Sequence, residues 1–480
     1  MGDKMDLREF CKKYFNNKID IINNHSISKI TDNSKEVVKN AVFVAIDGIN
    51  NKGIDYIDEA LDYGARTIIY SDDNIIKEEE INYIKVQNSF NWYNEYLLFE
   101  NKKKLDKIKI VGITGTNGKT TSSYIAYNIL RKYYNVCLIG TNGTYLSVKH
   151  LETHLNSKNT TPKLAYIIDI IKKISKINII ILEVSSEAIY YNRLGNLKFD
   201  IIGLTNIGHD HVNTHLDYNN YINTKSSLFK CFKESGLKCA IINYDEKYKD
   251  CFITNIENDI KLLSYGINNG NIKAELLSYN KTHMMIKVYD LHHEVIFGTN
   301  LLGYFNVYNI LLAFQIALVF KIDFMKIVES FSKDIIIPGR YTYIRHLNRD
   351  FYIDYAHNPE AVREYLKSIN HITDNMIICV IGAGGCKDAK KRPKMGYFAK
   401  MYSDILILTE DTSREEDLNN IINDLILELD STDYTIVKNR VEAIKYAYSI
   451  SKENDVIVLL GMGNDYYGEL NDKIVVESLK

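Results

Sequence analysis

The chain has 480 residues, of which 46% are hydrophobic and 25% charged, a composition typical of a globular protein with several domains. Its net charge of −2 excludes a nucleic-acid binder that depends on overall positive charge. The seven cysteines show no paired spacing, which argues against a disulfide framework or a zinc site. Because the first residues are charged and lack the apolar stretch of a signal peptide, we expect a cytoplasmic protein that does not enter the membrane.

The first 103 residues predict a small α/β domain. Apolar runs at 41–46 and 65–70 are typical of strands, and the segment 56–64 between them has a helical pattern. The lysine-rich stretch at 100–107 then predicts a linker to the next domain. A domain boundary is therefore expected near residue 103.

The middle of the chain, residues 104–335, alternates continuous apolar runs with amphipathic helical segments. Such runs are typical of parallel strands covered on both faces. The predicted strands lie at 108–114, 135–141, 177–184, 199–206 and 238–244. A further run, Leu301 to Phe320, is long enough to span a bilayer, but its Asn306 and Asn309 favour a buried helix of a globular domain.

The alternation restarts after residue 335 and predicts a second α/β domain over 336–480. Strand-like apolar runs lie at 350–356, 376–383, 404–410, 434–439 and 455–461. The pattern is typical of a Rossmann-like fold with a mostly parallel sheet. We therefore predict a three-domain α/β protein, divided into 1–103, 104–335 and 336–480.

The stretch GITGTNGKTTSSY, residues 112–124, predicts a phosphate-binding loop between a strand and a helix. It misses the strict P-loop spacing, because the position five before Gly118 is Ile113. The chemical parts are nevertheless present. Glycines admit backbone N–H groups close to phosphate oxygens, Lys119 can reach the β- and γ-phosphates, and Thr120 can bind Mg²⁺. The sequence therefore predicts that a nucleotide phosphate binds here.

Polar residues after the next strands predict a site for Mg²⁺. Glu183 ends a buried run, where ligands of parallel sheets collect, and can share Mg²⁺ with Thr120; the alternative is a strand-end glutamate that faces water. The following strand leads to Asn206, His209, Asp210, His211 and His215. This group predicts an open, oxygen-rich metal site or, alternatively, a polar surface loop. Lys225 follows on a predicted helix close to these acidic groups.

The predicted buried helix at 301–320 carries Asn306 and Asn309 on one face, because they are three residues apart. A buried amide needs a hydrogen-bonding partner. The edge of an adenine ring is one such partner, and a neighbouring helix is the other. The residues alone leave both interpretations open.

Together these stretches resemble the Mur ligases, ATP-dependent enzymes that form amide bonds during peptidoglycan precursor synthesis. The resemblance rests on GITGTNGKTTS, EVSS, LTNIGHDHVNTH, YINTKSSLF, FNVYN, PGR and DYAHNP, which follow the family's order and approximate spacing. The branch that adds the third peptide residue is most similar, on NTTP (159–162), SSEAIYYNRLGNLKFD and GAGGCKDAKKRPKMG. The resemblance implies a UDP-substrate-binding domain over 1–103, a central ATPase domain over 104–335 and an amino-acid-binding ligase domain over 336–480.

The resemblance also implies roles for individual residues. The implied ATP-binding residues are Gly115, Thr116, Asn117, Gly118, Lys119, Thr120, Thr121, Asn306, Asn309, Arg340 and Asp354. The implied Mg²⁺ ligands are Thr120, Glu183, His211 and Lys225, the last as a carbamylated lysine, and Lys119, Glu183, His211 and Lys225 are implied as catalytic. The UDP-substrate would meet Ser34, Asn159, Thr160, Thr161, Ser185 and Arg193. The amino acid would meet Lys391, Arg392, Asp411, Thr412, Arg414, Gly461 and Asp465.

The implied activity is ATP-dependent addition of a diamino acid to UDP-N-acetylmuramoyl-L-Ala-D-Glu through an acyl phosphate, by a monomeric enzyme. Diaminopimelate is favoured, because the guanidinium of Arg414 suits its distal carboxylate. The family's D-N-P-R reads DTSR at 411–414 here, however, and its G-K-G-H-E reads GMGND at 461–465. L-Lysine, or another amine used by a divergent paralogue, therefore stays an alternative.

Two other classes of protein are also considered. A folylpolyglutamate-type ligase shares the central ATPase, but the N-terminal resemblance and the NTTP stretch disfavour it. A non-catalytic nucleotide-binding scaffold would have lost metal or lysine positions, whereas Glu183, His211 and Lys225 are all present.

Overall fold

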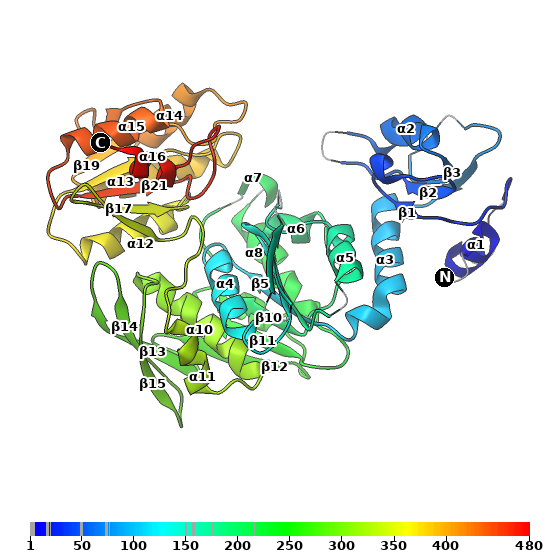
Figure 1. Cartoon of the computed structure of the whole chain (residues 1–480), viewed down its shortest axis with the longest axis horizontal. Coiled ribbons are helices and arrows are strands. Elements are labelled where there is room, and N and C mark those ends of the chain that lie inside the picture. Colours follow the sequence, from blue (N-terminus) through cyan, green and yellow to red (C-terminus); the bar gives the residue numbers. More distant parts are fainter. Residues whose placement is uncertain are drawn as a thin grey trace. The chain divides into compact units, whose positions relative to one another are not determined.

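The computed structural model describes residues 5–15, 19, 21–48, 51–72, 75, 77–148, 151–155, 159–174, 176–210, 212–215 and 217–480. The chain forms two compact units (Figure 1). The smaller unit comprises 1–107, 163–173 and 192–197, and the larger comprises 108–162, 174–191 and 198–480. The predicted division at 103/104 and 335/336 stays a prediction.

The smaller unit is built on a parallel sheet with the strand order β1-β2-β3-β4. Its strands are β1 (Ile30–Thr31), β2 (Ala41–Val44), β3 (Ala65–Tyr70) and β4 (Asn82–Lys85). Its helices are α1 (Leu7–Phe15), α2 (Ile57–Asp62), α3 (Ser89–Leu105), α5 (Leu164–Lys173) and the 3-10 turns η1 (Ser34–Glu36) and η2 (Gly53–Tyr56). The strands predicted at 41–46 and 65–70 and the helix predicted at 56–64 are confirmed.

The linker predicted at 100–107 is wrong over most of its length, because α3 continues to Leu105. Leu97, Asn101 and Leu105 are buried and lie four residues apart on one face of this helix. The lysines between them occupy the exposed face, and lysine is a good helix former. The charged run is therefore the solvated side of a helix and not a linker.

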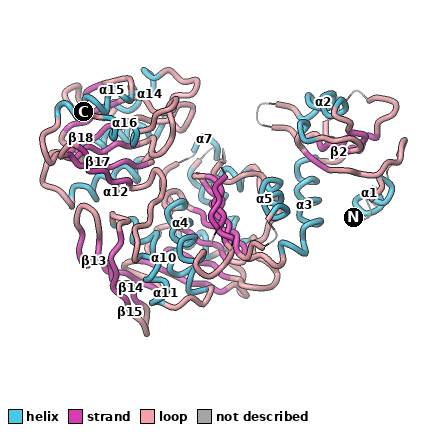
Figure 2. Tube along the Cα trace, in the orientation of Figure 1, coloured by secondary structure: helices cyan, strands magenta, loops and turns pink. Residues whose placement is uncertain are grey.

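The larger unit contains a central sheet, whose strands are among those drawn in magenta in Figure 2. Its strand order is β15-β14-β13-β12-β11-β10-β5-β9-β6-β7-β8. The strands in its middle are β5 (Lys109–Thr114), β6 (Val136–Gly140), β9 (Ile179–Glu183), β10 (Ile201–Leu204), β11 (Cys239–Asn243) and β12 (Lys261–Gly266). Neighbouring strands among these pair in parallel, which confirms the predicted buried strands.

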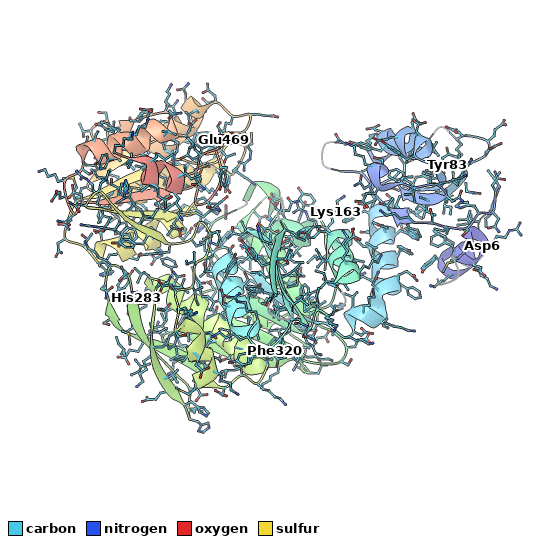
Figure 3. The ribbon with its side chains drawn as sticks, viewed as in Figure 1. Asp6, Tyr83, Lys163, His283, Phe320 and Glu469 are labelled. Carbon is cyan, nitrogen blue, oxygen red and sulfur yellow. The ribbon has the colours of Figure 1, made fainter. Side chains whose placement is uncertain are left out.

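Further strands extend this sheet at both edges. They are β7 (Gly143–Val148) and β8 (Leu151–Leu155) at one edge, and β13 (Ile272–Tyr279), β14 (Met284–Tyr289) and β15 (Glu294–Thr299) at the other. β13 joins β12 in parallel, and the remaining neighbours pair antiparallel. His283 lies in the turn between β13 and β14 (Figure 3). Side chains in β14 alternate between buried and exposed, so these strands lack the continuous apolar run that marked the parallel ones.

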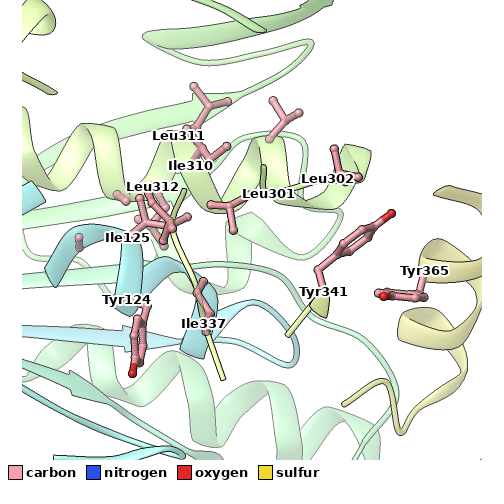
Figure 4. Packing of buried hydrophobic residues seen from close by; sticks show 14 of the residues in the cluster. Tyr124, Ile125, Leu301, Leu302, Ile310, Leu311, Leu312, Ile337, Tyr341 and Tyr365 are labelled. Carbon is pink, nitrogen blue, oxygen red and sulfur yellow. The ribbon is translucent and has the colours of Figure 1, made fainter. Parts of the chain in front are cut away.

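Helix α10 (Tyr304–Val319) is the buried helix expected in this unit. It packs against α4 (Lys119–Leu130), and Figure 4 shows Ile310, Leu311 and Leu312 on it beside Ile125. The shorter helices are α6 (Ser186–Tyr190), α7 (Val212–His215), α8 (Tyr218–Ser227), α9 (Lys249–Ile253), α11 (Phe324–Val328), η3 (Leu228–Lys230) and η4 (Glu329–Phe331). Among the residues described here, no helix has the length and apolar character needed to cross a bilayer.

A C-terminal sheet follows in the same unit, with the strand order β16-β17-β21-β18-β19-β20. Its strands are β16 (Thr342–His346), β17 (Arg349–Asp354), β18 (Ile377–Ile381), β19 (Ile405–Leu408), β20 (Thr435–Ile436) and β21 (Val456–Leu460). Its helices are α12 (Pro359–Asn370), α13 (Arg392–Met401), α14 (Leu418–Ile426), α15 (Arg440–Ile450), α16 (Asp472–Ser478) and η5 (Ala389–Lys391). β16 pairs antiparallel and the other neighbours pair in parallel, which confirms the mostly parallel α/β class.

One hydrophobic core joins the two sheets of the larger unit. It runs from Ile125 and α10 through Ile337 and Tyr341 to Tyr365 on α12 (Figure 4). The rings of Tyr341 and Tyr365 lie 4.8 Å apart between centroids. A separate core beneath α15 and α16 covers the other face of the C-terminal sheet.

Candidate functional site

The loop from Gly115 to Gly118 connects the end of β5 to the start of α4. Gly115 and Gly118 have φ angles of +144° and +84°, which favour glycine. A Cβ on Gly115 would lie 1.8 Å from Thr205 Oγ1, and one on Gly118 would lie 2.2 Å from Asn309 Oδ1. The glycines are therefore required both by backbone conformation and by close packing.

Lys119 begins α4 and folds back over this loop. Its Nζ donates to the carbonyl oxygens of Gly115 and Thr116 at 2.7 and 2.9 Å. Burial lowers the pKa of Lys119, although the charges of Glu183 and Asp210 oppose this effect. The ammonium group thus lies inside the glycine loop, where an anion could replace its contacts with neutral carbonyls.

Glu183 is 1% exposed at the end of β9. Its carboxylate accepts hydrogen bonds from Thr120 Oγ1 at 2.8 Å, Thr141 Oγ1 at 3.0 Å and Thr141 N at 3.2 Å. Burial raises the pKa of Glu183, although the threonine hydroxyls and Lys119 lower it. The water-facing alternative for this glutamate is therefore wrong.

The surroundings of Glu183 fit a hard cation. A Cβ on Gly140 would lie 1.9 Å from Glu183 Oε1, so only glycine allows the carboxylate to sit there. A buried carboxylate beside the Thr120 hydroxyl is an oxygen donor set of the kind that Mg²⁺ prefers, and a cation would balance the buried negative charge.

Lys225 projects from α8 toward the same loop and is 1% exposed. Its Nζ donates to Gly115 O at 2.9 Å and lies 4.9 Å from the ring centroid of Tyr221. Burial lowers the pKa of Lys225 well below its usual range, and the charge of Lys119 lowers it further. A neutral amine at this position would be a nucleophile.

The polar residues after β10 separate into different environments. Asp210 is buried, accepts a hydrogen bond from Lys391 Nζ at 2.8 Å and lies 3.5 Å from His357 Nε2. His209 is exposed, and its Nδ1 lies 2.9 Å from Glu360 Oε1. His211 lies outside the described residues, so its metal role stays a prediction. Within the described ranges, no three His, Cys, Asp or Glu side chains gather as metal ligands.

Asn306 and Asn309 take part in hydrogen bonds within α10 and to α4. Asn309 Nδ2 donates to Asn306 Oδ1 at 2.9 Å, and Asn306 Nδ2 donates to Leu302 O at 2.6 Å. Ser122 Oγ donates to Asn309 Oδ1 at 3.2 Å, which joins α10 to the helix after the glycine loop. The helix-to-helix interpretation is therefore confirmed, and the adenine role stays a prediction.

Thr160, Thr161 and Ser185, predicted to contact the UDP-substrate, lie beside Glu183. Thr161 Oγ1 donates to Glu183 O at 2.7 Å and accepts from Ser185 N at 2.9 Å. The hydroxyls of Thr160 and Thr141 are 3.1 Å apart. The predicted substrate residues and the predicted cation-binding carboxylate thus share one hydrogen-bonded network.

The other predicted substrate residues lie elsewhere. Asn159 is exposed in the larger unit, whereas Ser34 and Arg193 belong to the smaller unit. Ser34 is buried and its hydroxyl donates to Glu59 on α2. Their substrate roles stay predictions.

Arg340 precedes β16, and Asp354 is the last residue of β17. Asp354 accepts from Tyr341 N at 2.8 Å, and burial raises its pKa, although the nearby charge of Arg340 lowers it. The Arg340 guanidinium lies 4.8 Å from the ring centroid of Tyr355, whose hydroxyl donates to Asp465. A cation, a carboxylate and an aromatic ring therefore meet at the end of β17.

The residues predicted to bind the amino acid mostly follow the carboxyl ends of β19 and β21, with the loop after β18 between them. Arg414 Nη1 donates to Gly385 O at 2.5 Å. A Cβ on Gly461, whose φ is +105°, would lie 2.6 Å from Asp411 Oδ2. Thr412 Oγ1 lies 3.8 Å from Met462 Sδ. This is the sheet edge where ligands of parallel α/β proteins bind.

Lys391 and Arg392 differ from that group. Lys391 pairs with Asp210 of the central sheet. Arg392 is 1% exposed and donates to Glu416 at 2.6 Å and to Asp424 at 2.8 Å. Their role toward the amino acid stays a prediction, and these contacts favour a structural role for Arg392.

Sequence reasoning missed Thr141, His357 and Asn358. Thr141 directly follows the end of β6, so the rule that ligands collect at strand ends could have found it. His357 and Asn358 lie within the DYAHNP stretch, but their proximity to Asp210 and to the glycine loop depends on tertiary packing.

Comparisons with known proteins identify the family of the chain. The family descriptions "Mur ligase middle domain" and "Mur ligase, glutamate ligase domain" match residues 113–317 and 339–463. The UDP-N-acetylmuramoyl-L-alanyl-D-glutamate--2,6-diaminopimelate ligase 1 of Clostridium acetobutylicum is 33% identical over 466 residues, covering 94% of this chain and 93% of its own length.

Solved structures are similar over nearly the whole length. A UDP-N-acetylmuramoyl-L-alanyl-D-glutamate--2,6-diaminopimelate ligase is 26% identical, with a TM-score of 0.63 and coverage of 95% of this chain and 94% of that chain. MurF ligase from Thermotoga maritima in complex with ADP is 18% identical, with a TM-score of 0.65 and coverage of 90% and 93%. The second likeness concerns the fold alone.

Proposed function

The chain belongs to the Mur ligase family and is an ATP-dependent ligase, and from this premise we propose that it adds 2,6-diaminopimelate to UDP-N-acetylmuramoyl-L-Ala-D-Glu in peptidoglycan precursor synthesis. The observation that supports this most is the meeting of Lys119, Glu183 and Lys225 at one glycine loop, next to Thr160 and Thr161. The predicted phosphate-binding residues are therefore close to the predicted UDP-substrate residues, which supports the proposal.

We propose that the loop Gly115–Gly118 and Lys119 bind the β- and γ-phosphates of ATP. Thr120 and Glu183 would hold Mg²⁺, with His211 and Lys225 as further ligands. When bound, the ion would offset negative charge on the transferred phosphoryl group. Lys119 would supply positive charge to the same group. Its Nζ contacts only neutral carbonyl oxygens in these two hydrogen bonds, and these do not neutralise its charge.

Lys225 would act as a carbamate. Its nitrogen would form a bond to the carbon of CO₂ and release one proton, which converts an amine into an anionic oxygen ligand. This requires an uncharged amine, and the lowered pKa of the buried Lys225 supports it. The proposal is tested by ¹³C NMR after incubation with ¹³CO₂, where Lys225→Ala should lose one carbamate signal.

The reaction would proceed in two displacements. An oxygen of the substrate carboxylate bonds to the γ-phosphorus while the bond to the β–γ bridging oxygen breaks, which yields ADP and an acyl phosphate. The amine of the amino acid then bonds to the acyl carbon, loses a proton, and inorganic phosphate leaves with the electron pair. Thr160, Thr161 and Ser185 would orient the carboxylate toward the loop.

The amino acid would enter at the C-terminal sheet. Asp411, Arg414 and Gly461 lie at one edge of that sheet, and Arg414 offers a guanidinium for the distal carboxylate of diaminopimelate. We further propose the domain roles given above for 1–103, 104–335 and 336–480, a monomeric state and a cytoplasmic location. L-Lysine is the second candidate, because Thr412 and Asp465 depart from the family pattern.

The deciding experiment measures phosphate release from ATP with UDP-N-acetylmuramoyl-dipeptide and a panel of amino acids. We expect stimulation by diaminopimelate above that by L-lysine, and no release when the UDP-substrate is omitted. Preference for L-lysine would support the second candidate. No stimulation by any diamino acid would contradict both, and stimulation by glutamate with a folate substrate would favour a folylpolyglutamate-type ligase.

A further inference from the structure

Asn117 lies at the centre of the glycine loop, with its backbone held from one side. Its N–H donates to Asn206 Oδ1 at 3.0 Å, and its carbonyl accepts from Thr205 Oγ1 at 2.7 Å and Asn206 Nδ2 at 3.1 Å. The residues that follow β10 therefore fix the backbone of Asn117.

The side chain of Asn117 pairs with Asn358, which lies between β17 and α12 of the C-terminal part of the chain. Asn358 Nδ2 donates to Asn117 Oδ1 at 2.8 Å, and Asn117 Nδ2 donates to Asn358 Oδ1 at 3.2 Å. The two carboxamides thus form a reciprocal pair between residues that are 241 positions apart in the chain.

Asn358 is itself held in place. It is fully buried, and its Oδ1 accepts from Ala361 N at 3.0 Å as the N-cap of α12. The capping hydrogen bond restricts the side chain to one orientation, and this orientation directs Nδ2 toward Asn117. The pair is therefore a contact between two preorganised groups.

Residues after β10 make further contacts with the C-terminal part of the chain. Lys391 donates to Asp210, and His209 meets Glu360 in the first turn of α12. The opposite side of the loop is held by Asn309, which packs against Gly118 and accepts from Ser122. The glycine loop is thus fixed by the end of β10, by α10 and by the start of α12.

We propose that Asn358 is a positioning residue for the nucleotide, which acts through Asn117 to hold the glycine loop in its phosphate-binding conformation. Asn358 follows β17 of the C-terminal sheet, whose other strand ends carry the proposed amino-acid residues, so nucleotide affinity depends on a residue outside the central sheet. This inference deepens the proposed function, since it concerns the ATP of that reaction.

The test is a double-mutant cycle on the full chain, with the affinity for ADP in excess Mg²⁺ measured by calorimetry. Asn358→Ser keeps a capping hydroxyl for α12 but is too short to reach Asn117. We expect Kd for ADP to rise about tenfold, the size for loss of two neutral hydrogen bonds. Asn117→Ala should raise Kd for ADP by a similar factor. The Kd of the double variant should not exceed the higher Kd of the two single variants.

Asn471→Ser is the matched control, because Asn471 is also a buried N-cap, on α16. It should bind ADP within about twofold of wild type, as for independent sites. An Asn358→Ser variant that binds ADP as tightly as this control would overturn the proposal. The proposal would also be overturned if Kd for ADP rose in the double variant by the product of the two single-variant factors.

The proposed function and the role of Asn358 can be tested separately. ADP binding needs neither the UDP-substrate nor an amino acid, so the cycle can be measured on a chain with no ligase turnover. A wild-type chain without amino-acid-dependent phosphate release would contradict the proposed function, while shared, non-multiplying effects on ADP affinity would still support the role of Asn358.

Discussion

Arg440 and Glu183 are both buried charged residues of the larger unit, but their partners differ. Arg440 lies under the C-terminal sheet and donates to both carboxylate oxygens of Asp472, at 3.1 and 2.6 Å. Arg392 likewise meets Glu416 and Asp424. Glu183, Lys119 and Lys225 instead meet threonine hydroxyls and backbone carbonyls around the glycine loop.

The pKa values respond in opposite ways. Burial lowers the pKa of Arg440, but the charge and hydrogen bonds of Asp472, together with other nearby acidic groups, more than offset this and raise the pKa of the guanidinium. Burial raises the pKa of Glu183 and lowers that of Lys225, so the charged form of each is disfavoured. The ion pair of Arg440 thus balances its own charges, whereas Glu183 and Lys225 have no such partner among the described residues, which fits the charged ligand that we propose for this loop.

Replacement of Lys225 should give the largest effect. Lys225→Met removes the buried amine on which the proposed carbamate forms, so we expect ligase activity to fall by about 10³-fold or more. The free energy of unfolding should stay equal or rise by about 1 kcal/mol, because methionine fills the same space without burying a polar amine. Rate assays and urea titration check this, with the exposed Lys230→Met as control. Activity close to wild type would remove Lys225 from the reaction.

Replacement of Arg440 should act on stability instead. Arg440→Met leaves Asp472 buried without its cation, and we expect a loss of about 3–5 kcal/mol in the free energy of unfolding. Urea titration measures this loss, and Arg440→Met with Asp472→Leu should recover part of it. The control is Lys445→Met in the exposed pair with Glu442, expected to change stability by less than about 0.5 kcal/mol. Equal effects of the two single variants would contradict the comparison.

Thr141 offers a smaller test within the site. Thr141→Val keeps the shape but removes the hydroxyl that contacts Glu183 and Thr160, whereas Thr141→Ser keeps it. We expect an activity loss of about 10- to 100-fold for valine, the size of one or two hydrogen bonds to a charged group, and nearly full activity for serine. Similar rates for the two variants would show that the hydroxyl is not needed.

The pH dependence of stability at the buried Asp350 gives a further test of the comparison. Burial raises its pKa, but hydrogen bonds from Lys281 and Arg345 at 2.7 Å and from Tyr343 at 2.9 Å leave it below the usual value. Its contribution to stability is therefore present above about pH 4 and lost as pH falls through the lowered folded-state pKa.

Asp350→Asn should accordingly cost about 1–2 kcal/mol near pH 7, and the difference from wild type should shrink below about pH 4. Urea titrations at several pH values measure both quantities. A difference that stays constant down to pH 3 would show that the carboxylate charge does not stabilise the sheet.

The sequence was sufficient for the parts of the molecule that depend on local pattern. Continuous apolar runs predicted the parallel strands β5, β9 and β10, because both faces of these strands are buried. The positions of Lys119 and Glu183 followed, since strand ends and helix starts define the edge where ligands bind. The lysine-rich end of α3 failed as a linker because composition alone does not distinguish a solvated helix face from a loop.

Long-range pairs were beyond such reasoning. The contact between Asn117 and Asn358 depends on how the C-terminal sheet packs on the central one, and no local spacing encodes it. The ion pairs of the buried Arg392 with Glu416 and Asp424 could not be predicted for the same reason. In the sequence, an arginine near glycines has the same pattern whether it binds a ligand or a neighbouring helix.

The shared core beneath Tyr341 and Tyr365 also has a consequence for unfolding. Because the same apolar cluster covers α10 and α12, separating the two sheets would expose Ile337 and both tyrosine rings to water. Local opening at this junction therefore carries a large solvation cost, and we expect the two sheets to melt as one cooperative block. A calorimetric scan of the larger unit should show this as a single transition.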